Sequence, residues 1–418
     1  MSELSYLEKL MDGVEVEWKA VGDIAGYSTT KVDADKLDAT SFVGVDNLLA
    51  DKGGRIDATY QPNTARLTAY EPGDILLGNI RPYLKKVWMA ENNGGCSGDV
   101  LAIRILADCK KIISPEYLYY ALSSDSFFSY SMQHAKGAKM PRGSKDAILN
   151  YQIPIPCPSV PEKSLAIQSE IVRILDKFTA LTAELTAELT AELTMRKKQY
   201  NYYRDQLFSF NTEDVPHLPM GQKDIGEFIR GGTFQKKDFI DAGVGCIHYG
   251  QIYTYYGTYT EKTKTYISTA LAKKCKKAQK GDLIIATTSE NDEDVCKAVA
   301  WLGSKDIAVS SDACIYKHNL NPKYVSYFFQ TEQFQNQKRQ YITGAKVRRV
   351  NADNLSKILI PVPSMEIQER IVSILDKFDT LTNSITEGLP REIELRQKQY
   401  EYYRDLLFSF PKPETASN

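Results

Sequence analysis

No long apolar run occurs in this sequence, and that absence argues against a membrane-spanning helix. Of the 418 residues, 43% are hydrophobic and 25% are charged, but the two kinds are mixed, whereas a transmembrane helix needs about 18 or more consecutive apolar residues. The opening stretch MSELSYLEKLMDGVEVEW carries acidic residues and lacks the apolar segment typical of a signal peptide. The composition predicts a globular chain with two or three domains and no membrane partner.

Cysteine and histidine are few and scattered. The seven cysteines are an odd number and contain no C-x-x-C pair, which argues against a disulfide framework and favours the reducing cytoplasm. The four histidines show no zinc-ligand spacing. A formal net charge of −1 gives no overall attraction for nucleic acid, although binding depends on where the charges lie.

The chain instead contains a copy of itself. The segment IVRILDKF at 171–178 matches IVSILDKF at 371–378, and KQYNYYRDQLFSF at 198–210 matches KQYEYYRDLLFSF at 398–410, both with an offset of 200. The upstream regions match more weakly, around a shared GAK and around the closing IPIP and IPVP. A repeat of this size indicates a variable region and a shared helix, each present twice.

Each variable region is predicted to be mixed α/β. Short β-rich runs alternate with Gly, Asn and Asp turns, at Asp74–Leu77, Val100–Ile105, Asp282–Ala286 and Ala313–Tyr316. A helix is expected after SPEYL and after NPKYV, where Ser or Asn is the cap and Pro occupies the first turn. The alternating prolines of IPIPCPSVPEKS and ILIPVPSME favour an extended joint between domain and helix.

The shared segments are predicted to be long amphipathic helices. Apolar residues recur at spacings of three and four over residues 171–207 and 371–407. Each helix would have about 40–45 residues, roughly 60–68 Å, and two copies could bury their stripes against each other as an antiparallel coiled coil. The alternative is that each helix lies on its own domain. Because Gly388 and Pro390 fall inside the second helix, we expect two helical pieces with a bend between them.

The stretch TAELTAELTAEL at residues 182–193 repeats four residues three times. One leucine every four residues drifts by about 40° per step around an α-helix, so the run makes a poor heptad seam. Its simplest property is length, because each unit adds about 6 Å and about 40° of rotation. We interpret the repeat as a ruler that sets the distance between two domains; the alternative is a plain helical spacer.

These observations predict an α+β protein with an internal pseudo-twofold repeat, in which two α/β domains are separated by a long antiparallel two-helix coiled coil. The expected boundaries are 1–158 and 212–363 for the domains, 159–211 and 364–410 for the helices, and 411–418 for a C-terminal tail. Because the repeat looks circular, the N-terminal segment is expected to pack near the end of the second helix, with the termini close together.

This arrangement resembles the specificity subunit of a type I restriction-modification enzyme, over nearly the whole chain. The resemblance depends on two copies of the pattern GDIL…RPYLKKV…SPEYLYY…GAK…IPIP, each followed by a long helix, and on IVRILDKFTALTAELTAEL, which marks a TAEL-repeat subfamily. It implies that each variable region is a target-recognition domain for one half of a split, asymmetric site in double-stranded DNA. It also implies that the helices set the length of the unread spacer and dock two methyltransferase subunits.

The resemblance places the chemistry on partner subunits. It implies S-adenosylmethionine on the methyltransferases, and ATP and Mg on restriction subunits that join through the complex, with no cofactor or metal in this chain. The sequence agrees, because it lacks the F-x-G-x-G and [ND]-P-P-[YF] loops of a methyltransferase, NPKY at 321–324 is a helix start, and GAKMPRGSK lacks P-loop spacing. The alternatives are a divergent methyltransferase or nuclease, and a coiled-coil scaffold that does not bind DNA.

Candidate DNA contacts follow from charge and loop position. Phosphates need Lys, Arg or free N–H groups, and base edges need Arg, Asn, Gln, Ser or Thr. In the first domain the candidates are Asn79, Arg81, Tyr83, Lys85, Lys86, Lys136, Lys139, Arg142 and Lys145. In the second domain they are Gln251, Tyr253, Thr287, Thr288, Lys346, Arg348 and Arg349. The two GAK loops are favoured because they recur at the same place; the alternative for each residue is a surface charge or a packed tyrosine.

Candidate partner contacts lie where MRKKQYNYYRDQLFSF and LRQKQYEYYRDLLFSF concentrate Tyr, Arg and Phe, the residue types typical of interface anchors. They are Arg196, Tyr200, Tyr203, Arg204, Arg396, Tyr400, Tyr403 and Arg404. Two equivalent copies predict two equivalent partners. The alternative is that these aromatic residues are buried between the two helices.

Overall fold

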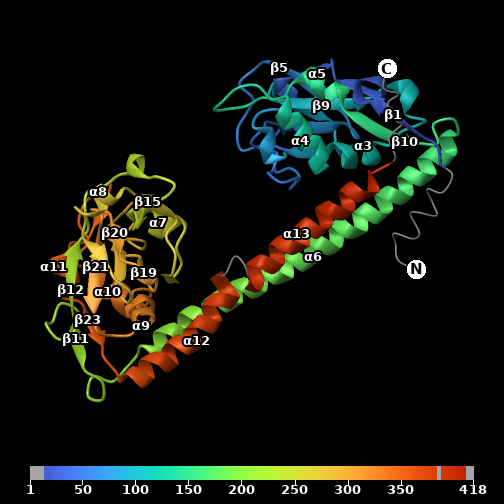
Figure 1. The fold of residues 1–418 in the computed structure, drawn as a ribbon. Coiled ribbons are helices and arrows are strands. Elements are labelled where there is room, and N and C mark those ends of the chain that lie inside the picture. Colours follow the sequence, from blue (N-terminus) through green and yellow to red (C-terminus); the bar gives the residue numbers. More distant parts are fainter. Residues whose placement is uncertain (1–13, 384–386, 411–418) are drawn as a thin grey trace. The chain divides into compact units, whose positions relative to one another are not determined.

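The computed structural model describes residues 14–383 and 387–410 and divides into two compact units. The first unit is Met1–Thr186 together with Glu394–Asn418, and the second is Ala187–Ile393. Each unit therefore combines one α/β domain with stretches of the long helices (Figure 1). The two chain termini and the expected tail 411–418 lie outside the described residues.

Two four-stranded sheets form the domain of the first unit. One is antiparallel, with the order β2 (Ala25–Tyr27), β9 (Val100–Ile105), β6 (Ile75–Gly78) and β7 (Val87–Met89). The other has the order β3 (Lys31–Asp33), β5 (Arg66–Tyr70), β8 (Gly94–Cys96) and β4 (Phe42–Val43), with β4 parallel to β8. A further ribbon pairs β1 (Val16–Ala20) antiparallel with β10 (Gln152–Pro156), the proline-rich segment predicted to be extended.

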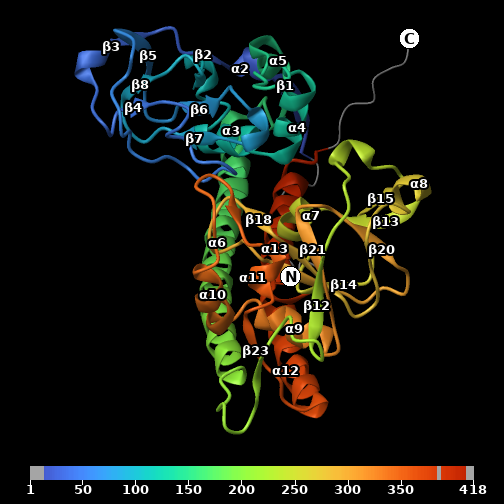
Figure 2. The same ribbon diagram turned by 90° about the vertical axis from the view of Figure 1, so that its left-hand side faces the viewer.

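Short helices cover these strands. They are α2 (Val21–Ile24), α3 (Pro115–Leu122), α4 (Asp125–Gln133) and α5 (Lys145–Asn150), with 3-10 turns η1 (Ala34–Lys36), η2 (Pro82–Leu84) and η3 (Ala107–Cys109). In Figure 2, α2 and α5 lie at one end of the domain and β3 and β5 at the other. Helix α3 begins as predicted, because Ser114 Oγ accepts the Tyr117 N–H at 3.1 Å and Pro115 occupies the first turn.

A five-stranded and a four-stranded sheet form the domain of the second unit. The larger sheet has the order β12 (Gly226–Arg230), β21 (Ala313–His318), β17 (Leu283–Ala286), β19 (Ala298–Trp301) and β14 (Tyr259–Thr260). The smaller has the order β15 (Thr265–Ile267), β13 (Val244–Ile247), β20 (Ile307–Val309) and β16 (Lys277–Ala278). Two ribbons pair β11 (His217–Pro219) with β23 (Leu359–Pro361) and β18 (Thr288–Ser289) with β22 (Arg348–Arg349).

The helices of this domain are also short. They are α7 (Tyr249–Thr254), α8 (Thr269–Ala272), α9 (Pro322–Phe328), α10 (Glu332–Arg339) and α11 (Ala352–Leu355), with a 3-10 turn, η4 (Lys236–Asp238). Asn321 caps α9 through its side chain, as predicted. The four predicted strands are confirmed as β6, β9, β17 and β21.

The two domains share one plan. The order β2-β9-β6-β7 of the first is repeated by β12-β21-β17-β19 of the second, and β1·β10 corresponds to β11·β23. The second sheets share a three-stranded centre, β5-β8-β4 against β16-β20-β13, in which one neighbour of the middle strand is antiparallel and the other parallel. They differ at the edge, where β3 lies beside β5 but β15 lies beside β13. The internal repeat is therefore a repeat of fold.

The long helices are α6 (Pro161–Leu207), α12 (Met365–Asn383) and α13 (Gly388–Leu407). In the first unit the ring of Phe178 stacks on Tyr403 with centroids 5.4 Å apart, and Ile171 and Leu175 share a core with Leu407. In the second unit the repeat-related pair is reversed, because Phe378 of α12 stacks on Tyr203 of α6 at 6.0 Å. Within each unit, then, the helices pair antiparallel, and each also lies on the adjoining domain. The predicted pairing of the two helices and the alternative, packing of each helix on its own domain, therefore both hold.

The second long helix is interrupted, as its sequence predicted. Helix α12 ends at Asn383 and α13 begins at Gly388. Gly388 has φ of +78°, and a Cβ there would lie 2.5 Å from the carbonyl oxygen of Thr380 and 2.6 Å from that of Leu381. This close approach to the last turn of α12 requires glycine. Pro390 falls in the first turn of α13, where its missing N–H breaks no helical hydrogen bond.

The beginning of the chain packs against the end of the second long helix. Val14, Val16 and Trp18 lie against the core that contains Leu407 and Phe410. The repeat-related arrangement occurs in the second unit, where Phe208 at the end of α6 and Leu218 share a core. The circular character of the repeat is therefore confirmed over the described residues.

Candidate nucleic-acid interface and helix surface

The two GAK loops fold into matching β-hairpins, one in each unit. In the first, which we call hairpin A (residues 136–142), the backbones of Lys136 and Arg142 exchange two hydrogen bonds of 2.9 Å. In the second, hairpin B (residues 343–349), Thr343 and Arg349 exchange the same two bonds at the same length. Both loops thus have seven residues and one closing geometry, although their side chains differ.

A glycine in the left-handed region closes each hairpin. Gly137 has φ of +104° and Gly344 has φ of +90°. A Cβ on Gly344 would lie 2.2 Å from the carbonyl oxygen of Val347, and one on Gly137 would lie 3.3 Å from that of Met140. The shared glycine of the GAK motif is therefore required by the turn, which explains why this motif is recognisable in both domains.

Hairpin A is held by the loop that follows β6. The Arg81 N–H donates to the carbonyl oxygen of Pro141 at 2.7 Å, and the Gly143 N–H donates to that of Asn79 at 3.0 Å. Arg81 itself is in the left-handed region, with φ of 52°. Its side chain and that of Tyr83 are exposed beside the hairpin, so these two candidates remain available to DNA.

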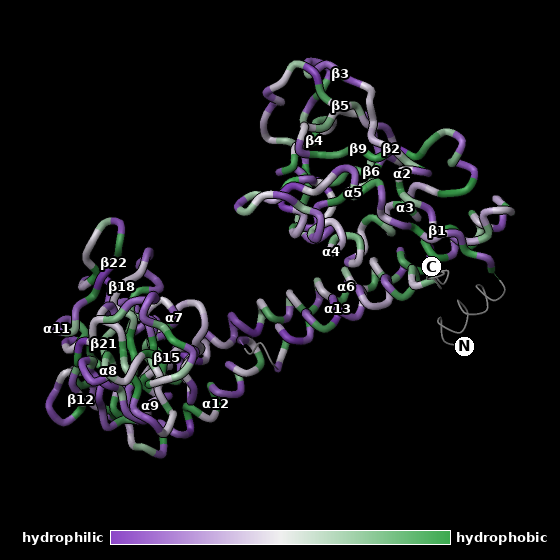
Figure 3. Tube along the Cα trace, turned by 45° about the horizontal axis from the view of Figure 1, so that its top comes forward, coloured by the Kyte–Doolittle hydropathy of each residue, from purple (hydrophilic) through white to green (hydrophobic). Residues whose placement is uncertain are grey.

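Hairpin B is held in the same way by the loop after β17. The Val350 N–H donates to the carbonyl oxygen of Thr287 at 3.2 Å, and Thr288 pairs with Arg349 in the β18·β22 ribbon. Figure 3 shows β18 and β22 at the periphery of their unit. Both domains therefore present a hairpin and a strand-end loop as one hydrogen-bonded surface.

Most of the cations predicted for the hairpins are solvent-exposed. Lys136, Lys139, Lys346 and Arg349 are exposed, as is Lys145 after hairpin A. Two arginines form ion pairs at the rim: Arg142 with Asp99 at 3.1 Å, and Arg348 with Asp292 at 2.8 Å. Because the Arg142 side chain remains 56% exposed in its ion pair, the pair is weak in water and a phosphate could replace the carboxylate.

The structure corrects the prediction that Lys85 and Lys86 contact DNA. The Lys85 ammonium lies 2.9 Å from Asp125, which also pairs with Lys52 at 2.9 Å and with Arg404 of α13 at 3.2 Å. Burial alone would raise the pKa of Asp125, but hydrogen bonds with Glu401, Lys85 and Lys52 outweigh it and hold that pKa well below its usual range. Lys85 therefore fixes the domain to its helix and is not free for DNA.

Lys86 likewise points inward, because its ammonium donates to the carbonyl oxygen of Val45 at 2.7 Å. Its partly buried position and this hydrogen bond give it a structural role within the first domain.

Five further candidates belong to the scaffold. Asn79, at 8% exposed, and Thr288, at 7%, are buried, and the Thr287 hydroxyl donates to the Asp312 carbonyl oxygen at 2.9 Å. The Tyr253 hydroxyl donates to the Thr288 carbonyl oxygen at 2.8 Å, and the Gln251 amide is engaged by the His248 N–H and by Thr265. The sequence could not show that the side chains of Gln251, Tyr253 and Thr287 already have partners, or that Asn79 and Thr288 are buried.

The structure also corrects the prediction of a partner contact for three of the helix residues, because they are buried within the chain. Arg404 is 1% exposed, Tyr200 is 4% exposed and Arg204 is 8% exposed. Tyr200 donates to Gln330 at 2.9 Å, and the Tyr400 hydroxyl is 2.8 Å from that of Thr179. The alternative, burial of the aromatic residues between the two helices, holds in part: Tyr200 meets Phe378 of α12 as well as Gln330 of the domain, and Tyr400 meets Thr179 of α6.

A different set of side chains on the same helices faces solvent. Tyr203 and Tyr403 lie over the phenylalanines named above, and Arg196 and Arg396 are partly or fully exposed. Two pairs of repeat-related residues that were not predicted from the sequence are also exposed: Met195 and Leu395, at 48% and 43%, and Tyr202 and Tyr402, at 61% and 65%. We call these four residues the helix patch. Their seven-residue spacing could have identified one helical face.

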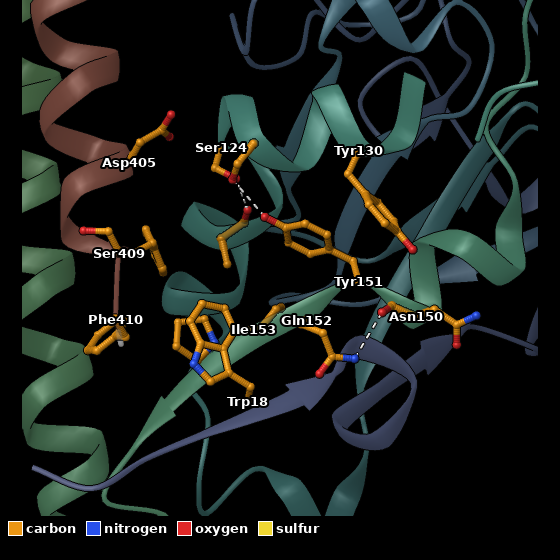
Figure 4. Close-up of a pocket in the computed structure, with 14 residues that line it drawn as sticks. Trp18, Ser124, Tyr130, Asn150, Tyr151, Gln152, Ile153, Asp405, Ser409 and Phe410 are labelled. Atoms are coloured by element: carbon orange, nitrogen blue, oxygen red, sulfur yellow. Dashed lines mark hydrogen bonds between the residues drawn. The ribbon is translucent and has the colours of Figure 1, made fainter. Parts of the chain in front are cut away.

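The first unit contains a cavity that is lined mainly by aromatic, apolar and uncharged polar side chains. The cavity, of about 580 Å³, lies between the end of α13 and the domain, lined by Trp18, Tyr130, Tyr151 and Phe410 (Figure 4). Among its described lining residues Asp405 is the only carboxylate, and no histidine, lysine or cysteine is present. Over the same described residues no cluster of His, Cys, Asp and Glu could hold a metal ion, and no helix is long and apolar enough to span a membrane.

Two solved structures share this fold. A chain from a study of complex assembly and conformational transition of the type I R-M system superposes with a TM-score of 0.67 at 17% identity, covering 94% of this chain and 97% of that one. The HsdS subunit from Thermoanaerobacter tengcongensis superposes with a TM-score of 0.51 at 16% identity, covering 94% and 96%.

Sequence comparison gives the family. The family model of the type I restriction modification DNA specificity domain matches twice, at residues 72–195 and 219–395. The chain is 40% identical to the type I restriction enzyme EcoR124I/EcoR124II specificity subunit of Escherichia coli, over the full length of both. It is 32% identical to a putative type I restriction enzyme specificity subunit of Haemophilus influenzae, over 97% and 98% of the two chains. The chain belongs to the family of type I restriction-modification specificity subunits, which are non-catalytic DNA-recognition components.

Proposed function

We propose that each domain reads one half of a bipartite, asymmetric DNA site through its hairpin and the loop that holds it. The observation that carries this proposal is the pair of hairpins A and B, which share one backbone geometry and differ in side chains. A common framework with different contact residues is what two related but unequal half-sites require. Exposed lysines and arginines beside the tips supply the phosphate contacts that fix register.

The spacer between the half-sites is set, in this proposal, by α6. The TAEL residues 182–193 lie within this one helix, where Leu181 is 51% exposed and Leu185, Leu189 and Leu193 are only partly buried, so these leucines lie outside the buried cores of the units. Such weakly committed side chains allow whole four-residue units to be added or removed with little loss of core. This supports the assignment to a TAEL-repeat subfamily.

The helix patch is proposed to dock two methyltransferase subunits. Met195 with Tyr202, and Leu395 with Tyr402, offer two repeat-related apolar and aromatic anchors, and aromatic side chains dominate the energy of protein interfaces. Restriction subunits would join through the same complex. S-adenosylmethionine, ATP and Mg are then expected on those partners, as membership of this family implies.

The test is to map methylated bases in a genome that expresses this chain with its methyltransferase partner. We expect a site of two unequal halves with a fixed spacer, and loss of methylation at that site when Lys139, Arg142, Lys346 and Arg349 are replaced by alanine together. A contiguous site, or one that is unchanged by these replacements, would contradict the proposal. Transfer of a radiolabelled methyl group by the isolated chain would instead favour an enzyme.

A further inference from the structure

The tip of each hairpin carries an exposed apolar side chain. Met140 is 49% exposed and Val347 is 45% exposed. The two residues occupy the same place, since each follows the lysine of the GAK motif and precedes the residue that leads into the closing strand. Both lie outside the apolar cores of their units.

Solubility does not explain an apolar residue at this position. The neighbouring tip residues Ala138, Lys139, Ala345 and Lys346 are exposed as well, so the tips are fully solvated and nothing in the fold requires a methionine or a valine there. The feature is nevertheless present in both domains, whose other loops have diverged. An exposed apolar side chain flanked by cations suits a binding partner whose surface has charged groups at its rim and apolar groups at its centre.

Duplex DNA has such a surface in its major groove. The phosphates at the rim match Lys139 and Lys346, and the apolar group on the base edges is the C5-methyl of thymine. The major groove is wide enough for a two-stranded β-ribbon, whereas the minor groove is about half as wide. Each hairpin is a two-stranded ribbon closed by a pair of backbone hydrogen bonds, and its anchor to the strand-end loop keeps the tip in one position.

We propose that the two hairpin tips enter the major groove and that Met140 and Val347 each contact the C5-methyl group of a thymine in their half-site. This inference rests on the proposed function, because it takes the two domains to be readers of two half-sites. It adds a chemical identity: each half-site contains a thymine that is recognised by its methyl group. Valine is stiff and short, so hairpin B should tolerate less displacement of that methyl than hairpin A, where methionine is flexible.

The experiment uses the chain in complex with its methyltransferase partner and short duplexes that carry the mapped site. Each thymine of a half-site is replaced in turn by uracil, which removes only the methyl group, and binding is measured by fluorescence anisotropy. For the wild-type chain, one replacement in each half-site should weaken binding about fourfold, the change that accompanies loss of one buried methyl group. Met140→Ala should abolish that sensitivity in one half-site, and Val347→Ala in the other.

Two further variants guard against misfolding and non-specific effects. Met140→Leu keeps an apolar side chain of similar size and should retain the uracil sensitivity, whereas Met140→Gln should lose it. Met365→Ala is the matched control, because Met365 is 47% exposed on α12 and belongs to neither hairpin; it should leave the sensitivity of both half-sites unchanged.

The outcomes separate this inference from the proposed function. If the wild-type complex does not distinguish the mapped site from a scrambled duplex, the proposed function fails. If it does distinguish them but no uracil replacement weakens binding, or the sensitivity persists in both alanine variants, the assignment of the tips is wrong. A half-site without any A·T pair would also overturn the assignment. So would a different result with 2-aminopurine, a fluorescent base analogue placed in the half-site: bright fluorescence that Met140→Ala abolishes would indicate that Met140 is wedged between two unstacked bases.

Discussion

Gln168 Oε1 accepts the backbone N–H of Ser114 at 3.0 Å, and Gln368, 200 residues later, accepts that of Asn321 at 2.9 Å. The two glutamines are 0% and 1% exposed and lie near the beginnings of α6 and α12. Their partners are the residues that cap α3 and α9. Each long helix is therefore joined to the domain that precedes it by the same buried polar contact.

A second hydrogen bond strengthens each of these joints. Tyr120 of α3 donates to Asp176 of α6 at 2.6 Å, and Tyr327 of α9 donates to Asp376 of α12 at 2.7 Å. Charge-assisted hydrogen bonds of this kind are directional and among the stronger ones in proteins. They hold each domain in one orientation on the helix next to it, which a reader of DNA requires.

We predict that Gln168→Leu loosens the joint of the first unit. The Gln168 amide also donates to the carbonyl oxygen of Ile112 at 2.7 Å, which the Ser164 hydroxyl contacts at 3.4 Å. The substitution therefore leaves the part-buried Ser114 N–H without a partner and removes the shorter hydrogen bond to Ile112, at a cost of about 1–3 kcal/mol. Hydrogen exchange should become faster for the amides of α3 by a factor of about ten or more. The amides of α9 should be unaffected, because their own glutamine is intact.

The matched control is Gln397→Leu, at an exposed position of α13, which should leave exchange in α3 unchanged. Unaltered protection of α3 in the Gln168→Leu protein would show that apolar packing alone holds the joint.

Removal of residues 190–193 should shorten the spacer between unchanged half-sites. One TAEL unit contributes about 6 Å of helix and about 40° of rotation, against a rise of about 3.4 Å per base pair. We expect the preferred spacer to shrink by about one or two base pairs, as seen in methylated-site maps, while the bases of both half-sites stay the same.

Thr190→Ser, which keeps the length of α6, serves as the control and should leave the spacer unaltered. The ruler interpretation is wrong if the deletion protein methylates the original sites at the original spacing.

Much of the fold could be predicted from the sequence, because the same local patterns occur in both copies of the repeat. The GDIL and GDLI runs, the SPEYL and NPKYV helix starts, the alternating prolines and the paired long helices depend on local patterns, and local patterns can be read. Gly388 is a good example. Glycine and proline together predicted an interruption of the helix, but only the structure shows its cause, the contact of Gly388 with the carbonyl groups of Thr380 and Leu381.

The candidate site could be predicted only in part, because exposure is decided by tertiary structure. The GAK motif identified both hairpins, since its glycine is required by the backbone. Lys85 and Arg404, in contrast, have the sequence signature of a phosphate contact and a partner contact, yet both meet Asp125, which is 40 residues from one and 279 from the other in the chain. The pattern of charges along the sequence does not predict ion pairs between residues so far apart in the chain.

Tyr202 and Tyr402 illustrate the opposite case. Each is next to a tyrosine that lies over the opposing helix, and the rotation of about 100° between neighbouring residues of an α-helix decides which of the two faces outward. We predict that replacing both by alanine weakens capture of the methyltransferase subunit by about tenfold or more, the usual loss for an interface anchor. Binding is measured by titration of the purified partner, with each single variant expected to affect one of two sites.

Tyr255→Ala, at an equally exposed tyrosine of the second domain, is the control and should bind the partner as the wild-type chain does. Equal capture by the double variant and the wild type would remove the helix patch from the interface.

His318, at the end of β21, should make the second domain sensitive to mild acid. Burial lowers the pKa of its imidazole to about 4, from an ordinary value of 6.5. Between these two values the unfolded chain binds a proton that the folded chain does not, so the free energy of unfolding falls as the pH drops below about 6.5 and is unaffected above it. From pH 7.5 to pH 5.0 the loss is about 2 kcal/mol, which we expect in hydrogen exchange of the β12–β21 amides.

His318→Gln removes the titrating group and should flatten this pH dependence, whereas His134→Gln, at an exposed histidine of the first unit, should not. Retention of the full slope in His318→Gln would assign the acid sensitivity to another group of the domain, such as His248, whose pKa burial also lowers. The distinction bears on function, because β21 pairs with β17, the strand that leads into the loop holding hairpin B. A domain that opens at β21 in mild acid should therefore lose its half of the DNA site first, while the first domain, at that pH, continues to bind its own.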